Sequence, residues 1–331
     1  MKRAKFWEEM EGEKVKCNLC PHHCTIKEGG RGLCNVRENQ GGVLYSLVYG
    51  KVASLARDPI EKKPLYHFHP GTQVLSYGTM GCNLSCMFCQ NQSLSNGDPE
   101  SSYLRDYSAE DLIKETMNYA GIAWTYNEPT ISYEFSYDVF KGVKEREDKY
   151  TVYVTNGYIE KEPLDQIAPY LDAMNIDIKA FSEDFYKNIV GGTLEPVLKT
   201  AKRAVEKNIH VEVTYLIIPG HNDSREELQR FCKWVAENLG VDNVVHFSRF
   251  HPDHKMRDVS RTPAKKMKEA RKIAKDEGLN FVYLGNLPAD NDTRCPDCGT
   301  VVLSRSYFSS GGPNLKDGKC PECGRDIPII Q

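Results

Sequence analysis

The sequence has no excess of charge of either sign. Its 331 residues include 43 Lys and Arg against 46 Asp and Glu, which gives a formal net charge of −3. A protein that holds nucleic acid non-specifically needs a strongly basic surface, so we expect no nucleic-acid partner. The length suits one large domain with small appendages. The sequence contains no internal repeat, low-complexity tract or long linker.

Long apolar runs are missing as well. No stretch approaches the ~20 residues that a membrane-spanning helix needs. The positive charges near the start are not followed by an apolar segment, as they would be in a secretory leader. We therefore expect a cytoplasmic protein that does not contact a membrane.

Cysteine, in contrast, is plentiful. Eleven of the twelve cysteines fall into three tight groups, which in a chain without a leader indicates metal ligation rather than disulfides. Cys232 stands apart, among apolar residues at helical spacing, and is expected in the core. The groups are Cys17, Cys20, Cys24 and Cys34; Cys82, Cys86 and Cys89; and Cys295, Cys298, Cys320 and Cys323.

The region 73–286 alternates short β-branched runs with amphipathic stretches. This alternation predicts repeated βα units, and thus an α/β fold with a parallel sheet, here a partial (β/α)6-type TIM-like barrel. In such folds the loops after the carboxyl ends of the strands carry the chemistry. Residues 1–72 are expected to form a four-cysteine module with a lead-in, and residues 287–331 a zinc ribbon. The expected strands are 73–78, 121–126, 150–155, 172–179, 210–218, 243–247 and 281–285.

The middle cysteine group directly follows the first expected strand, with the spacing C-x3-C-x2-C. A [4Fe–4S] cluster normally takes four thiolates, so Cys82, Cys86 and Cys89 would leave one iron open. An open position distinguishes a catalytic metal centre from a structural one, while half of a zinc site is the alternative. The motif resembles the signature of the radical S-adenosylmethionine (radical SAM) superfamily, in which SAM occupies the open iron.

That resemblance implies a reaction. One electron, from a donor such as ferredoxin or flavodoxin, cleaves SAM to methionine and a 5'-deoxyadenosyl radical, which abstracts hydrogen from a substrate. The sequence does not identify the substrate. Formation of a glycyl radical on a partner protein and modification of another molecule both stay open, and the added metal modules favour the second. A non-catalytic zinc-ribbon binding protein is the alternative from another class.

Further strand-end segments resemble those of the enzymes that activate glycyl-radical proteins, such as pyruvate formate-lyase activating enzyme. Residues 124–130 read Trp-Thr-Tyr-Asn-Glu-Pro-Thr where that family has Gly-Gly-Glu-Pro. The match implies that Glu128, with Asn127 beside it, accepts the SAM amine through a charge-assisted hydrogen bond. Tyr126 and Asn127 replace the glycine pair, so the backbone approach is expected to differ there.

Two more strand ends complete the match. Thr155 and Asn156 stand in a Thr-Asn-Gly segment, which implies contacts with the ribose or the methionyl part of SAM. Asp177 and Lys179 correspond to the family's Asp-Leu-Lys, in which the cation meets the SAM carboxylate and the acid holds the cation. An ordinary ion pair at a barrel rim is the alternative for these two.

Two ring residues are weaker candidates for the same ligand. Phe88, between the last two cysteines of the loop, suits the aromatic position that contacts adenine in the superfamily. His251 follows a later strand, where the related enzymes also carry a histidine. It is expected either to contact SAM or substrate, or to be a structural histidine.

The remaining two groups each have four ligands. Two C-P-x-C-G knuckles at Cys295, Cys298, Cys320 and Cys323 predict a closed tetrahedral site for structural zinc, with iron as the alternative. The spacing at Cys17, Cys20, Cys24 and Cys34 does not decide between zinc and a second cluster. Four ligands that close the site favour zinc, and either His22 or His23 could replace a thiolate. The segment that carries these four N-terminal cysteines, together with residues 58–68, resembles the radical SAM member of the AmmeMemoRadiSam system.

Overall fold

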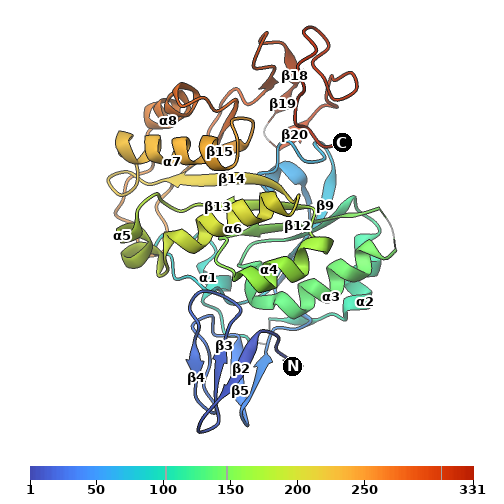
Figure 1. The fold of residues 1–331 in the computed structure, drawn as a ribbon, viewed down its shortest axis with the longest axis vertical. Helices are drawn as coiled ribbons and strands as arrows, with labels where there is room; N and C mark the ends of the chain where they lie inside the picture. Colours follow the sequence, from blue (N-terminus) through green and yellow to red (C-terminus); the bar gives the residue numbers. More distant parts are fainter. Residues whose placement is uncertain (101–102, 147, 307) are drawn as a thin grey trace.

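A single eight-stranded sheet organises the chain (Figure 1). The computed structural model describes residues 1–100, 103–146, 148–306 and 308–331. In these parts each parallel strand of the sheet pairs with the next parallel strand along the chain. The parallel strands are β9 (Gln73–Gly78), β11 (Gly121–Trp124), β12 (Tyr150–Thr155), β13 (Ala173–Asp177), β14 (His210–Ile217), β15 (Val244–Arg249) and β16 (Phe281–Gly285).

These strands confirm the predicted parallel sheet, and their bounds lie within two residues of the expected ones. One strand of this central sheet was not predicted. β8 (Ser54–Pro59) pairs with β9 in the antiparallel direction and forms one edge of the sheet, with Leu55 opposite Tyr77. The segment before residue 73 therefore contributes to the central sheet.

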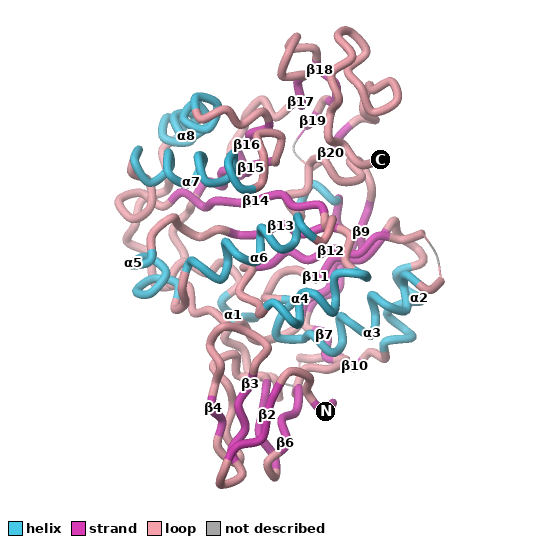
Figure 2. Tube along the Cα trace, viewed as in Figure 1, coloured by secondary structure: helices cyan, strands magenta, loops and turns pink. Residues whose placement is uncertain are grey.

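Apolar runs explain why the strands lie in the interior. Ile122, Ala123 and Trp124 are all fully buried, as expected for a parallel sheet covered on both faces. Long helices lie along one face of the sheet (Figure 2). They are α2 (Ala109–Thr116), α3 (Tyr133–Lys144), α4 (Lys161–Ile167), α6 (Leu194–Glu206), α7 (Arg225–Asn238) and α8 (Ala264–Asp276).

Local capping sets where two of these helices begin. The Ser108 hydroxyl accepts a hydrogen bond from the backbone N–H of Asp111 at the start of α2, and Ser224 does the same for Glu227 at α7. Such caps satisfy backbone donors that have no partner within the helix. Cys232 is fully buried in α7, as predicted for a core residue. The short helices are η1 (Ile60–Lys62), α1 (Gln92–Ser95), η2 (Pro129–Ser132), η3 (Ala168–Tyr170), α5 (Glu183–Phe185) and η4 (Tyr186–Val190).

Two small modules extend from opposite ends of the sheet (Figure 1). The N-terminal module contains two three-stranded sheets, ordered β2-β3-β4 and β1-β6-β5, and β7 pairs with β10 nearby. Its strands are β1 (Lys2–Arg3), β2 (Trp7–Met10), β3 (Lys14–Cys17), β4 (Thr25–Ile26), β5 (Arg37–Gln40), β6 (Val43–Ser46), β7 (Lys51–Val52) and β10 (Arg105–Asp106). The C-terminal module holds β17 (Thr293–Arg294), β18 (Val301–Leu303), β19 (Arg305–Ser306) and β20 (Ser309–Ser310).

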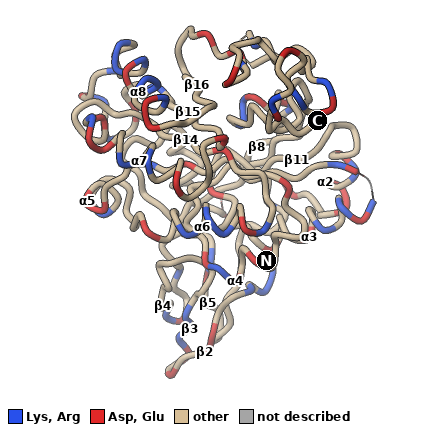
Figure 3. The backbone as a smooth tube through the Cα atoms, turned by 45° about the horizontal axis from the view of Figure 1, so that its top comes forward, with Lys and Arg blue, Asp and Glu red and all other residues tan. Residues whose placement is uncertain are grey.

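Charged residues of both signs are interspersed along the whole chain (Figure 3). This distribution agrees with the balanced composition and shows no extended basic face in the view drawn. Among the residues that the structure describes, no helix combines the length and the apolar character needed to cross a bilayer.

Candidate active site

A cavity of about 480 Å³ opens where the parallel strands end. Residues that follow β9, β11, β12 and β13 converge there, as the parallel arrangement requires. With one exception, the residues that the sequence proposed for the cluster and for SAM line this one cavity. They are Cys82, Cys86, Phe88, Cys89, Asn127, Glu128, Thr155, Asn156, Asp177 and Lys179.

The three-cysteine loop offers sulfur atoms with donors directed at them. The backbone N–H of Leu84 lies 3.4 Å from the Cys82 sulfur, and the side-chain amide of Asn156 lies 3.8 Å from it. Burial raises the pKa of Cys86 to about 11 and raises that of Cys82 well above its usual value. The free thiols of Cys82 and Cys86 therefore stay protonated at neutral pH, and binding a metal centre releases these two protons.

Packing on two sides holds the loop in place. Gly81 has φ +94°, and a Cβ there would lie 2.6 Å from a methyl of Val36 and 2.7 Å from the Cys34 carbonyl oxygen. On the other side, the backbone N–H groups of Ser85 and Met87 donate to carbonyls of the segment 189–190, at 2.9 Å each. The N-terminal module is therefore in direct contact with the loop, and only glycine fits at that contact.

Glu128 is the most extensively hydrogen-bonded carboxylate of the cavity. One oxygen accepts from the Thr130 N–H at 3.0 Å and from the hydroxyls of Thr130 and Thr155 at 2.7 Å, while the other accepts from the Asn156 N–H at 2.7 Å. Burial raises the pKa of Glu128, although these four donors oppose the shift. A buried, oriented carboxylate facing a cavity is suited to bind an ammonium group.

Asp177 and Lys179 form the ion pair that the sequence predicted. Their Oδ2 and Nζ atoms lie 2.7 Å apart at the end of β13. Burial alone would lower the pKa of Lys179, but the carboxylate of Asp177 holds it above its usual value. Lys179 is therefore a permanent cation at the cavity wall, available for a ligand carboxylate.

Asn127 lies in the cavity wall, yet its side chain braces the cysteine loop. Its amide oxygen accepts from the Thr79 N–H at 3.1 Å, and its amide nitrogen donates to the Gly81 carbonyl at 2.8 Å. These bonds connect the end of β11 to the residues just before Cys82. The structure thus shows Asn127 in a positioning contact.

His251 is the exception among the predicted residues, because it does not line the cavity. Its Nδ1 atom lies 3.1 Å from the side-chain nitrogen of Gln90, which does line it. The ring is 42% exposed and reaches the cavity rim through this contact. Phe88, in contrast, is buried in the wall beside Phe185.

Sequence reasoning assigned no role to a group of side chains beside Tyr126. Tyr126 adopts a left-handed backbone with φ +71°, at a position that the sequence resemblance matches to a glycine. Its hydroxyl donates to Asp58 at 2.7 Å, and the same carboxylate oxygen pairs with Lys63 at 2.8 Å. Lys63 is almost fully buried and lines the cavity. The lead-in segment thereby supplies part of the cavity wall.

Comparison with known proteins identifies the family. Residues 76–235 match the model of the radical SAM superfamily. The chain belongs to the radical SAM superfamily. It is 47% identical over 336 residues to an uncharacterized protein of Methanocaldococcus jannaschii, covering all of both chains. It is also 25% identical over 185 residues to the pyruvate formate-lyase 1-activating enzyme of Escherichia coli, covering 53% of this chain and 73% of that enzyme.

Solved structures agree with this fold. Streptococcus suis SuiB bound to S-adenosylmethionine superposes with a TM-score of 0.51 at 14% sequence identity, covering 65% of this chain and 52% of SuiB. As a radical SAM enzyme, the chain requires a [4Fe–4S] cluster and SAM. The donor set fits them, since three thiols with N–H donors at Cys82 face a cavity with a carboxylate and a cation. When bound, the cluster supplies the electron that cleaves SAM to methionine and a 5'-deoxyadenosyl radical, which abstracts hydrogen from the substrate.

The C-terminal cysteines form a separate and compact set. The sulfurs of Cys295 and Cys323 lie 3.4 Å apart, and those of Cys298 and Cys320 lie 3.6 Å apart. All four lie within 4.8 Å of one another. Around a tetrahedral zinc ion with bonds of about 2.3 Å, thiolate sulfurs stand roughly 3.8 Å apart, so the set is compatible with one metal ion.

Proposed function

We propose that Cys82, Cys86 and Cys89 hold the catalytic cluster and that SAM binds in the cavity beside them. In this assignment Glu128 accepts the methionyl amine and Lys179 receives the methionyl carboxylate. The observation that carries the proposal is their convergence, because three thiols, a buried carboxylate and a buried cation from separate strands line one cavity. That cavity is also large enough for a cofactor of this size.

The other wall residues complete the proposed SAM site. Asn156 stands between the two halves of the site, since its N–H donates to Glu128 while its side chain contacts Asn83 and the Cys82 sulfur. Thr155 is positioned for the ribose or methionyl part, and Phe88 for the adenine. His251, at the rim through Gln90, is assigned to the substrate side of the cavity.

The experiment is an anaerobic assay of the reconstituted protein with dithionite. Wild type is expected to form 5'-deoxyadenosine from SAM, and Cys82→Ala is expected to lose the activity by at least about a thousandfold, because a two-thiolate site does not retain the cluster. Cys232→Ala, a buried cysteine in α7 outside the cavity, is the matched control and is expected to keep the activity. Turnover by Cys82→Ala at the control's rate would contradict the assignment.

For the substrate, we favour a molecule other than a glycyl-radical enzyme. Tyr126, at one position of the family's glycine pair, and Lys63, from the lead-in segment, both fill cavity wall, so we expect a site of different shape from that of the activating enzymes. Installation of a glycyl radical on a partner protein is the second candidate, supported by the similarity to the Escherichia coli activating enzyme. A role in an AmmeMemoRadiSam system, with ferredoxin or flavodoxin as the donor, rests on the sequence resemblance. Zinc is our assignment for the C-terminal cysteines.

A further inference from the structure

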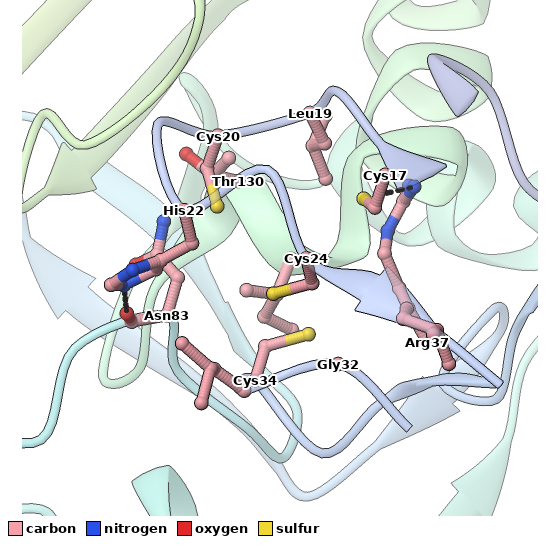
Figure 4. A pocket seen from close by; sticks show the side chains of 13 residues that line it. Cys17, Leu19, Cys20, His22, Cys24, Gly32, Cys34, Arg37, Asn83 and Thr130 are labelled. Atoms are coloured by element: carbon pink, nitrogen blue, oxygen red, sulfur yellow. Dashed lines mark hydrogen bonds between the residues drawn. The ribbon is translucent and has the colours of Figure 1, made fainter. Parts of the chain in front are cut away.

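The four N-terminal cysteines surround a cavity of their own (Figure 4). Cys17 ends β3, Cys20 and Cys24 lie in the following loop, and Cys34 lies in the loop before β5. The remaining wall is mixed: Leu19, Ile26, Leu33 and Ile131 are aliphatic, while His22, Arg37, Asn83 and Thr130 are polar or charged. Four thiols thus face one enclosed space, with a guanidinium in its wall.

The separation of the sulfur atoms distinguishes a single ion from a cluster. Four thiolates on one zinc ion must approach closely, as the compact C-terminal set does. In a [4Fe–4S] cluster each thiolate binds a different iron at a separate corner of the cube, which pushes the sulfurs much farther apart. Within residues 1–100, 103–146, 148–306 and 308–331, only the C-terminal set has three or more ligand atoms all within 4.8 Å.

The C-terminal cysteines and the radical SAM loop therefore allow a comparison within this chain between a site for a single ion and a site for a cluster. The four C-terminal sulfurs are close enough for one ion, whereas the three sulfurs of the radical SAM loop do not all lie within 4.8 Å of one another. No three of the N-terminal sulfurs all lie within 4.8 Å of one another either, and Figure 4 shows their side chains placed around the space between them. We propose that Cys17, Cys20, Cys24 and Cys34 bind a second [4Fe–4S] cluster, with every iron held by the protein, rather than the zinc that four closing ligands favoured.

A buried guanidinium supports a cluster in this space. Arg37 lines the cavity and is 1% exposed, with its Nη1 atom 3.8 Å from the Cys17 sulfur. Its Nη2 atom pairs with Glu134, while its Nε has no hydrogen-bond partner. N–H donors directed at sulfur are one means by which a protein tunes a cluster. The unpartnered Nε is thus available to a cluster sulfur or thiolate.

The second cluster would lie directly behind the catalytic one. Asn83 lines the N-terminal cavity, while its neighbour Cys82 lines the SAM cavity. The imidazole Nε2 of His22 lies 2.6 Å from the Asn83 carbonyl oxygen, and the Cys34 carbonyl packs against Gly81. This proximity assigns a role that rests on the proposed function: the second cluster takes one electron from a reduced protein donor and passes it to the catalytic cluster. The donor is oxidised by one electron, SAM is reduced by one, and the second cluster returns to its starting state.

Metal analysis after anaerobic reconstitution tests the site. Wild type is expected to hold about eight iron, about eight sulfide and about one zinc per chain, and Cys20→Ala about four iron. The triple variant Cys82→Ala/Cys86→Ala/Cys89→Ala is expected to keep about four iron in a cluster whose electron paramagnetic resonance spectrum ignores SAM. Wild type with about four iron and two zinc would overturn the second cluster, and so would a triple variant without iron–sulfur signal.

The choice of reductant tests the relay. Dithionite is small and reaches the catalytic cluster directly, whereas flavodoxin must dock on the surface. Cys20→Ala is expected to slow flavodoxin-driven 5'-deoxyadenosine formation roughly tenfold more than dithionite-driven formation. Equal slowing with both would overturn the relay. Failure of the proposed function itself is distinct, because wild type would then form no 5'-deoxyadenosine with either reductant.

Discussion

Glu128 shows how single residues define this site. Four donors fix its carboxylate, and burial raises its pKa, so the ionised form gains from a cationic ligand placed against it. We expect Glu128→Gln to weaken SAM binding by about 10- to 100-fold, the loss of one charge-assisted hydrogen bond of roughly 1.5–3 kcal/mol. Equilibrium titration of the reconstituted protein with SAM measures the change.

A second buried glutamate provides the control. Glu227 accepts from the Phe181 N–H at 2.7 Å and from the Tyr215 hydroxyl at 2.9 Å, in α7 and away from the cavity. Glu227→Gln is expected to lower stability while SAM affinity stays within about twofold of wild type. If Glu128→Gln binds SAM as tightly as Glu227→Gln does, the amine contact belongs to another residue.

Sequence and structure agree where the signal is local. Thr155, Asp177 and Lys179 follow apolar runs, and in a parallel sheet the residues after such runs meet at one edge, so their convergence was predictable. Asp58 and Lys63 were not assigned roles, because their place beside the cavity depends on the antiparallel pairing of β8 with β9. That pairing is a long-range contact without a local signature.

At the scale of elements, β14 ties the lead-in segment to the amino end of the sheet. The carboxylate of Glu212 accepts from the backbone N–H groups of Tyr66 and His67 at 2.9 and 2.7 Å. It also contacts the rings of His210 at 3.0 Å and His246 at 2.6 Å. Burial alone would raise the pKa of Glu212, but these contacts hold it well below the usual value. The network anchors a loop that crosses the amino ends of the strands.

His67 makes this junction sensitive to acid. Burial lowers its pKa to about 3, whereas an unfolded histidine titrates near 6.5. Between these values the unfolded chain binds the extra proton, so stability falls as pH decreases from about 6.5. From pH 7 to pH 5 we expect His67 to account for a loss of about 2 kcal/mol in the free energy of unfolding, measured with urea. His67→Gln should lack this loss, and His221→Gln, at an exposed loop residue, should retain it.

At the scale of the whole molecule, the two small modules serve opposite ends of one sheet (Figure 1). The N-terminal module contacts the cysteine loop at the carboxyl ends of the strands, through Cys34 and Gly81. The C-terminal module contacts the lead-in at the amino ends, where Ile330 exchanges backbone hydrogen bonds of 2.8 Å with residues 67 and 69. The first module is therefore placed to influence catalysis, and the second to influence stability.

Disrupting the C-terminal cysteines should lower stability without lowering catalytic activity. Cys298→Ser is expected to lose about one zinc per chain and to destabilise the module, because a closed thiolate site supplies much of the folding energy of so small a unit. The module's remaining attachments, such as the pair between Arg325 and Asp242 at 2.9 Å, lie at the amino end of β15. Dithionite-driven 5'-deoxyadenosine formation at low temperature should therefore stay within about twofold of wild type, while hydrogen exchange accelerates at His69, whose backbone N–H donates to Ile330. Loss of SAM cleavage with unchanged exchange would show instead that the C-terminal module acts on the catalytic site.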